Sequence, residues 1–185
     1  MGTFPKIAES VTLEHQIAEL MAEQKRIGWP FDVRKAQELE NQLLTELEKL
    51  KKQAENICHF VPHNLFTPKR DNKKQGYFAG CEMQRLKDFN PSSREHIAWW
   101  FTTFQGWKPT KLTPTGKAVI DETVLKEIGT EEALVFLSIL VIQKKLGMLS
   151  QGTNAWLKLV KDGRLHHSCF IGAVTHRMAH SHPNL

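Results

Sequence analysis

The stretch from Asp32 to Ile57, DVRKAQELENQLLTELEKLKKQAENI, decides the fold class of this chain. Its apolar side chains recur every three or four residues over about three heptads, which is the spacing of an amphipathic helix. The opposite face carries glutamates and lysines, and Asp32 can cap the first turn. The pattern predicts a long helix packed on a narrow stripe. The apolar positions are Ala36, Leu39, Leu43, Leu47, Leu50, Ala54 and Ile57.

A second predicted helix precedes this one. Residues Thr12–Ile27 place apolar side chains on one face, with Thr12 as a possible N-cap and Gly28 as a possible end. The Trp29-Pro30 pair then interrupts the pattern, because proline cannot continue a helix. Together the two segments predict a two-helix arm over residues 12–57. An ordinary amphipathic helix of a bundle explains most patterns of this kind, and a free-standing coiled coil is the less favoured alternative.

The segment 58–89 has a different character. Prolines and glycines interrupt it and basic side chains crowd its middle, so we expect a small basic hairpin near residues 66–87. Directly after it, Ser92 to Glu95 matches a capping box. In that motif the Ser92 side chain accepts a hydrogen bond from the amide of Glu95, while the Glu95 side chain covers the amide of Ser92. The motif predicts the start of another helix.

The remainder predicts two more helices and a strand. Asp121 can begin a short helix that ends at Gly129, and Leu134–Leu146 is apolar nearly all round, which predicts a central buried helix. Arg164–Cys169 alternates loosely, as a strand does. In a longer protein this strand would pair with neighbouring strands, and alone it would fray or pair with another copy. The expected fold class is mainly α: an elongated helical domain with a long two-helix arm, a small β-hairpin and a short C-terminal strand.

Composition narrows the class of protein. The 185 residues are 41% hydrophobic and 24% charged, which fits a globular chain rather than a disordered one. No apolar run reaches the ~18 residues of a membrane span. The first ten residues have no apolar core of a secretory signal. Three cysteines, Cys58, Cys81 and Cys169, are too few for a disulfide framework. We therefore expect no membrane partner and a reducing compartment.

The net charge of +5 is unevenly distributed. Residues 1–59 carry −2, residues 60–117 carry +6, residues 118–143 carry −4 and residues 144–185 carry +5. Two basic zones therefore flank an acidic one, which favours a polyanion such as nucleic acid as the partner. Charge alone does not decide this, since many basic proteins bind no nucleic acid.

Several kinds of chemistry are not indicated. No phosphate-binding loop, dinucleotide fingerprint or nucleophile elbow occurs. The histidines and cysteines lack the close CxxC pairs typical of structural zinc sites. Asp162 is the only acidic residue after Glu132, whereas two-metal phosphoryl transfer needs at least two carboxylates held close together. We therefore expect no metal site and no catalysis by this chain alone.

The sequence favours a grip on a nucleic-acid duplex. Asn90, Ser92 and Ser93 open a helix whose first amides can hold a phosphate, and such contacts hold a backbone without reading sequence. A solvated loop is the alternative explanation of the basic hairpin. The other candidate contacts are Lys69, Arg70, Lys73 and Lys74 on the hairpin, and Lys108, Lys111, Thr113 and Thr115 in the later loop.

Four stretches together resemble the DNA polymerase I family, family A, and above all the replicative polymerases of podophages. They are VTLEHQIAELMAEQKRIGWPFD at 11–32, NPSSREHI at 90–97, TPTGKAVIDETVL at 113–125 and DGRLHHSCFIGAVTHRMAHSHPNL at 162–185. The last stretch matches most specifically, because a family signature reads roughly T-G-R-x-x-x-x-x-P-N-L and this chain has Thr175-His176-Arg177 followed by Pro183-Asn184-Leu185.

The resemblance implies a piece of a longer polymerase that grips the primer–template duplex, its backbone and minor groove, behind the active site. Residues 1–152 would be the thumb subdomain, with the helical arm at 12–57, the basic hairpin or insertion at 58–89 and the helical tip and return helices at 90–152. Residues 153–185 would begin the palm. Magnesium-dependent nucleotide addition would belong to the parent protein, with the remainder of the polymerase chain as a partner, in the cytoplasm of a bacterial host cell.

The resemblance also assigns roles to single residues. Arg177, with Thr175 of the signature, would contact the primer strand, and Arg94 would face the duplex backbone with Asn90, Ser92 and Ser93. Lys144 and Lys145 match a basic stretch near the duplex. His176 departs from the more frequent glycine of the signature.

The insertion at 58–89 is short. Some podophage relatives have a much longer one that binds a host thioredoxin clamp, and no such clamp is implied here. Two alternatives stay open: a stand-alone, non-catalytic helical nucleic-acid-binding protein, and a helical interaction protein whose basic charge is incidental.

Overall fold

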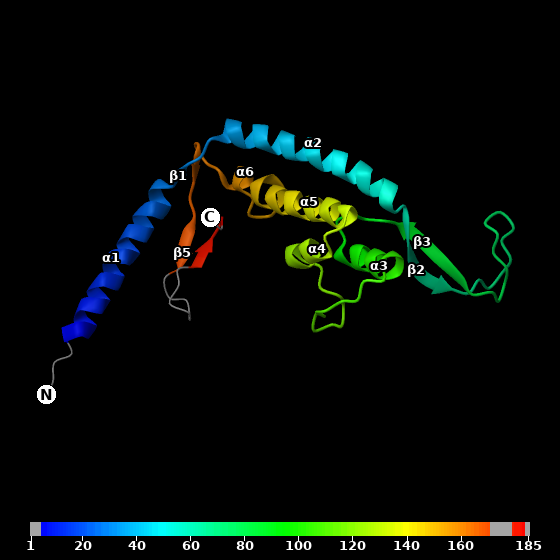
Figure 1. Cartoon of the computed structure of the whole chain (residues 1–185). Helices are drawn as coiled ribbons and strands as arrows, with labels where there is room; N and C mark the ends of the chain where they lie inside the picture. The colour runs from blue at the N-terminus through cyan, green and yellow to red at the C-terminus, as the bar shows by residue number, and fades with distance from the viewer. Residues whose placement is uncertain (1–4, 171–178, 184–185) are drawn as a thin grey trace. The chain divides into compact units, whose positions relative to one another are not determined.

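The computed structural model describes residues 5–170 and 179–183 of the chain. Helices dominate it and the strands are short, so the predicted mainly α class is confirmed (Figure 1). The elements are α1 (Pro5–Ile27), β1 (Trp29–Pro30), α2 (Val33–Ile57), β2 (Phe60–Phe66), β3 (Met83–Asp88), α3 (Arg94–Phe104), α4 (Glu122–Ile128), α5 (Glu131–Leu146), the π-helical turn η1 (Gly147–Gln151), α6 (Trp156–Leu159), β4 (Arg164–Leu165), β5 (Ser168–Phe170) and β6 (Ala179–Ser181).

Contacts divide the chain into two compact units. The first unit contains residues 1–43 and 144–185, and the second contains residues 44–143. Helices α2 and α5 each begin in one unit and end in the other. This division follows contacts in space, and the predicted thumb and palm boundary near residue 152 stays a prediction.

In the first unit, α1 ends where the sequence predicts. Gly28 has φ +72° and its amide donates to the carbonyl of Gln24 at 2.8 Å. The predicted start is wrong, because the helix begins at Pro5 and Thr12 lies inside it rather than capping it. The physical reason is that no glycine or proline interrupts the chain between Pro5 and Thr12, and proline itself is tolerated in a first turn. The predicted cap of α2 is confirmed, since Asp32 Oδ1 accepts from the amide of Lys35 at 3.0 Å.

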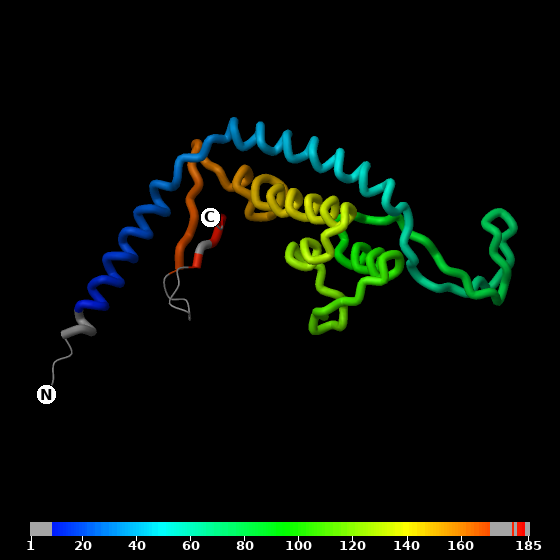
Figure 2. The backbone as a smooth tube through the Cα atoms, viewed as in Figure 1, coloured from blue at the N-terminus to red at the C-terminus, as the bar shows by residue number. Residues whose placement is uncertain are grey.

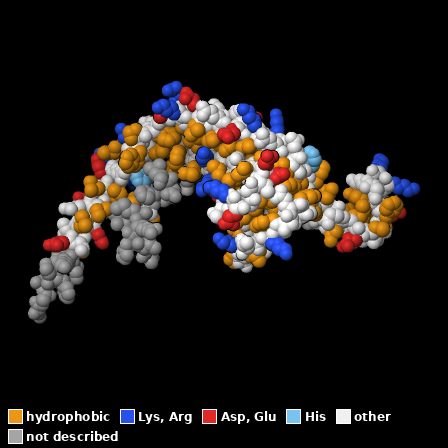
Figure 3. All heavy atoms as spheres, in the orientation of Figure 1, with side chains coloured by type: hydrophobic (Ala, Val, Ile, Leu, Met, Phe, Trp, Pro, Cys, Tyr) orange, Lys and Arg blue, Asp and Glu red, His pale blue; other side chains and the backbone are white. Residues whose placement is uncertain are grey.

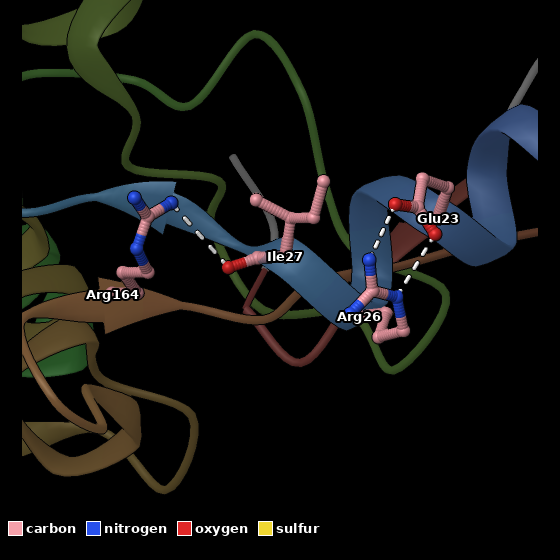
Figure 4. Close-up of polar contacts among 4 residues, drawn as sticks. All are labelled: Glu23, Arg26, Ile27 and Arg164. Carbon is pink, nitrogen blue, oxygen red and sulfur yellow. Dashed lines mark hydrogen bonds and ion pairs between the residues drawn. The ribbon is translucent and has the colours of Figure 1, made fainter.

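The end of α1 is tied to β4. The short strands β1 and β4 pair antiparallel, with Trp29 opposite Leu165, and the Arg164 guanidinium donates to the carbonyl of Gly28 at 3.0 Å. Figure 4 shows the same guanidinium reaching the carbonyl of Ile27, next to the local ion pair of Glu23 and Arg26. A side chain at position 28 would also meet the His166 ring at 2.9 Å, so this close approach requires glycine.

The predicted strand Arg164–Cys169 is in fact two strands. β4 pairs with β1, and β5 pairs antiparallel with β6, with Ser168 opposite Ser181. Two residues, His166 and His167, separate them. The expectation that this segment would fray or pair with another copy is therefore wrong, because β1 pairs with β4 and β6 pairs with β5 within the same chain.

The second unit has an aromatic core between α3 and α5. Phe136 of α5 is fully buried, and its ring centroid lies 5.6 Å from Phe89, 5.9 Å from Trp100 and 5.9 Å from Phe101. Helix α4 lies beside them (Figure 1), and its predicted limits are confirmed. Its N-cap Asp121 accepts from the amide of Val124 at 2.8 Å. The helix ends at Gly129, whose backbone is left-handed.

Helix α5 buries one face rather than its whole circumference. Leu134 is 50% exposed, whereas Ala133, Phe136 and Ile139 are fully buried, so the segment predicted as a central buried helix is buried on one face only. Within the described residues, one helical run, Glu131–Leu159, is long and apolar enough to cross a membrane by length and composition. Its buried face packs inside the protein, as the face of a core helix does.

The predicted hairpin is present. β2 and β3 pair antiparallel from Phe60 opposite Asp88 to Phe66 opposite Met83, with an irregularity between Pro62 and Leu65. Strand β3 lies at the end of the predicted range 66–87, whereas β2 begins before that range, at Phe60. The loop 67–82 continues beyond the strands (Figure 2).

Candidate nucleic-acid interface

Strand β3 leads directly into a tight turn at residues 90–93, in front of α3. The amide of Ser93 donates to the carbonyl of Asn90 at 3.0 Å, and the amide of Ser92 donates to the Asn90 side-chain oxygen at 2.9 Å. The amide of Phe89 donates to the carbonyl of His59 at 2.8 Å, which anchors the turn to the start of the hairpin. The sequence-predicted residues Asn90, Ser92 and Ser93 are therefore brought together by their own backbone.

The predicted capping box does not form. Ser93, not Ser92, is the N-cap of α3, and its side chain makes no capping hydrogen bond. The Ser92 hydroxyl instead accepts from the side chain of Gln143 on α5, and the Glu95 carboxylate pairs with Lys117. Both side chains of the motif thus bond to residues that are distant in the sequence. These long-range bonds replace the local bonds of a capping box.

The loop before α4 is fastened to the start of α3 by that ion pair. Lys117 lowers the pKa of the Glu95 carboxyl through a hydrogen bond and its positive charge. The predicted donors Thr113 and Thr115 bond to each other, their hydroxyl oxygens 2.9 Å apart, and Thr113 also accepts from the amide of Lys117 at 3.1 Å. These two threonines therefore shape the loop itself, while Lys111 is exposed.

The hairpin loop carries the cations that the sequence analysis singled out. Figure 3 shows basic side chains at its outer end, beside exposed hydrophobic ones, and Phe78 is 64% exposed. The loop holds its shape through an isolated bridge between Asn72 and Tyr77 and through Asp71, which accepts from the amide of Ala79 at 2.7 Å. The exposed cations are Lys69, Arg70, Lys73 and Lys74.

Sequence reasoning missed two basic side chains on the strand itself. Arg85 and Lys87 are exposed on β3, and their spacing of two residues places them on one face of the strand. The guanidinium carbon of Arg85 lies 4.3 Å from the centroid of the Phe66 ring, a cation–π contact. The available signal was the spacing of two residues between the basic side chains Arg85 and Lys87 in a predicted hairpin. These residues place positive charge between the loop and the turn.

The remaining predicted residues lie in three different parts of the chain. Arg94 is exposed on the first turn of α3. Lys144 and Lys145 lie in the last turn of α5, in the first unit. Thr175 and Arg177 lie outside the described residues, as does most of the C-terminal signature.

The described residues offer no ligand set for a metal. Within residues 5–170 and 179–183, no three His, Cys, Asp or Glu side chains lie together as a metal site requires. The magnesium that the resemblance implies for a longer polymerase therefore does not fit the described part of this chain.

Comparison with known proteins relates this chain to DNA polymerases. No protein-family model matches the chain. It is 32% identical to the DNA-directed DNA polymerase of Enterobacteria phage T3 and 31% identical to that of Escherichia phage T7, over 227 positions and 96% of this chain. The chain is thus a region related to DNA polymerases. More particularly, the polymerases that it resembles are those of two phages, T3 and T7.

The matched region is only part of those relatives. It covers 32% of each, so the chain spans about a third of the length of the curated relatives it matches. The alignment also has more positions than this chain has residues, so the relatives carry additional residues inside the matched region.

Proposed function

We propose that this chain is a thumb-type region of a DNA-directed DNA polymerase, and that it grips the backbone of a primer–template duplex. The observation that carries the proposal is the sequence relationship to two phage polymerases along 96% of the chain. The basic hairpin and the turn at 90–93 support it, because both lie in one compact unit and follow one another along the chain.

The two elements suit different parts of a backbone contact. The exposed lysines and arginine of the loop attract phosphates over a distance and release counterions on binding. The turn presents an amide side chain, hydroxyls and the first amides of α3, which have no intrahelical partner and form a site suited to one phosphate. Such contacts fix the position of a duplex and do not read its sequence. We therefore expect weak duplex binding without sequence preference.

Nucleotide addition belongs, in this proposal, to a longer polymerase and not to this chain alone. Its support is the sequence itself, in which Asp162 is the only acidic residue after Glu132. Purified chain incubated with primer–template, nucleotides and magnesium should leave the primer unextended. Extension by a preparation free of contaminating polymerase would contradict this part of the proposal.

The grip is tested by the salt dependence of duplex binding. If about four phosphates are neutralised, the plot of log K against log salt concentration should have a slope of about −3.6, from roughly −0.9 per phosphate. Lys73→Ala should flatten that slope by about one unit on every duplex sequence tested. Fluorescence anisotropy with a labelled primer–template measures both values.

A matched control is Lys126→Ala, which removes the same charge from the exposed last turn of α4. It should leave the slope unchanged. Equal slopes for wild type and both variants would remove the hairpin loop from the interface. The absence of duplex binding at low salt would contradict the proposed function as a whole.

A further inference from the structure

His96 is a buried histidine directly behind the turn. It lies in the first turn of α3, is 8% exposed, and its Nδ1 atom accepts a hydrogen bond from the amide of Asn90 at 2.9 Å. Since Nδ1 accepts, the neutral ring carries its proton on Nε2. The ring also lies against Phe89, with 5.9 Å between centroids. A buried side chain thus fixes the first backbone amide of a turn that otherwise faces solvent.

A second side chain fixes the other end of the same turn. Gln143 of α5 donates to the Ser92 hydroxyl, 51 residues away in sequence. The hydroxyl proton of Ser92 then remains available to point elsewhere, because the oxygen is the acceptor of this bond. The turn is therefore held by α3 and α5 as well as by its own bonds. Its backbone amides are used in these bonds, so the donors that it can offer a ligand are the Asn90 side-chain amide and the hydroxyls of Ser92 and Ser93.

We propose that His96 is a positioning residue, which in its neutral form holds the turn at 90–93 in the conformation that presents donors to one phosphate of a nucleic-acid backbone. This inference rests on the proposed function and deepens it. The contact itself is made by Asn90, Ser92 and Ser93, and His96 acts through the amide of Asn90. Protonation of Nδ1 would set two donors face to face, so the hydrogen bond would be lost and the turn released.

The surroundings of the ring favour the neutral form. Burial lowers the pKa of His96 below its ordinary value, and the positive charge of Lys87 on β3 lowers it further, while Glu95 on α3 opposes them. Because the folded-state pKa lies below the unfolded one, the stability contributed by the neutral ring is fully present above about pH 6.5 and is lost as the pH falls through the folded-state value. The turn should therefore be fully held at neutral pH.

Two substitutions separate the acceptor from the packing. His96→Asn places its side-chain oxygen where Nδ1 lies and so keeps an acceptor, whereas His96→Leu keeps apolar volume and removes it. We expect His96→Leu to weaken duplex binding by about three- to tenfold, the worth of one hydrogen bond, with an unchanged salt slope. His96→Asn should bind within about twofold of wild type. Equal binding by the two variants would overturn the proposal.

The pH dependence of duplex affinity provides a second test, because loss of the His96 acceptor should weaken binding as the pH falls, whereas added positive charge should strengthen it. Protonation of histidines elsewhere adds positive charge and should strengthen duplex binding as the pH falls. The ratio of wild-type to His96→Asn affinity should nevertheless fall between pH 7.5 and 5.5, because only the wild type loses its acceptor. His15→Gln, an exposed change on α1, is the control whose ratio to wild type should show no such fall. A constant wild-type to His96→Asn ratio would count against the proposal.

A measurement on the wild type alone guards against variants that fail to fold. Hydrogen exchange followed by NMR should show the Asn90 amide protected at pH 7.5, with its protection factor falling as the His96 ring titrates. An unprotected Asn90 amide at pH 7.5 would overturn the positioning role. Duplex binding that depends on Lys73 but not on His96 would refute this inference and leave the proposed function standing, whereas no binding by wild type would refute the proposed function.

Discussion

The hairpin loop at 67–82 and the turn at 90–93 are neighbours on the chain, yet they are built in opposite ways. The loop carries four exposed cations and holds its shape through bonds between residues of its own, such as Asn72 with Tyr77. The turn contains no charged residue, and side chains of α3 and α5 hold it in addition to its own two hydrogen bonds. The loop is therefore charged but supported only locally, whereas the turn is uncharged and supported by residues distant in the sequence.

This difference indicates two separate contributions to one grip. Long basic side chains attract a polyanion from a distance and are screened by salt, with a Debye length of about 8 Å at physiological ionic strength. A preorganised turn contributes only at contact, but it fixes the position of what it touches. Changes to the loop should therefore alter the salt slope, and changes behind the turn should alter affinity at constant slope.

The largest expected effect on stability comes from the aromatic core around Phe136. Phe136→Ala should lower the free energy of unfolding by about 3–5 kcal/mol, because a fully buried aromatic side chain in contact with Phe89, Trp100 and Phe101 is removed. Urea unfolding followed by tryptophan fluorescence measures this. Phe104→Ala on α3 is the control, since Phe104 is 62% exposed and should cost far less. Equal losses for the two would contradict the central place of Phe136 in this core.

A smaller effect is expected from the support on α5. Gln143→Ala should cost about 1 kcal/mol of stability, because the Ser92 hydroxyl loses its donor. Duplex affinity should fall a few-fold at an unchanged salt slope, which calorimetric melting and anisotropy titrations can establish. Gln105→Ala removes a comparable side chain whose bond to Glu132 is long, at 3.3 Å, and exposed. A changed salt slope in the Gln143 variant would contradict the separation of the two contributions.

The smallest effect should come from the exposed ion pair of Glu95 and Lys117. Both side chains are largely exposed, so solvent screens their attraction. The pKa of Glu95 is held below its ordinary value by Lys117, so the stability that the carboxylate contributes is present at neutral pH and is lost as the pH falls through the lowered pKa. Glu95→Gln should shift the melting temperature measurably only in low salt. A shift in melting temperature that persists in 1 M salt would show that the Glu95–Lys117 ion pair is stronger than expected for two exposed side chains.

Local patterns were sufficient for most element boundaries. The left-handed glycines at positions 28 and 129 end α1 and α4, and Asp32 and Asp121 cap α2 and α4, as the sequence predicts. These features succeed because each depends on backbone geometry or on a bond between residues three positions apart. The start of α1 was misplaced at Thr12 because a residue type suited to a cap is also tolerated inside a helix.

The sequence by itself determined the helical class, the caps at Asp32 and Asp121, the glycine ends at Gly28 and Gly129, and the residue types of the candidate contacts. Only the tertiary structure decided which partner each polar side chain would take. Ser92 and Glu95 read locally as a capping box, yet they bond to Gln143 and Lys117, which the fold brings to them from 51 and 22 residues away. Likewise His96 is an ordinary helix residue in the sequence, and only burial beside Phe89 and the amide of Asn90 makes it an acceptor. The physical reason is that a hydrogen-bonding group takes the partner that folding places within reach, and sequence spacing reveals only the partners that lie within one turn.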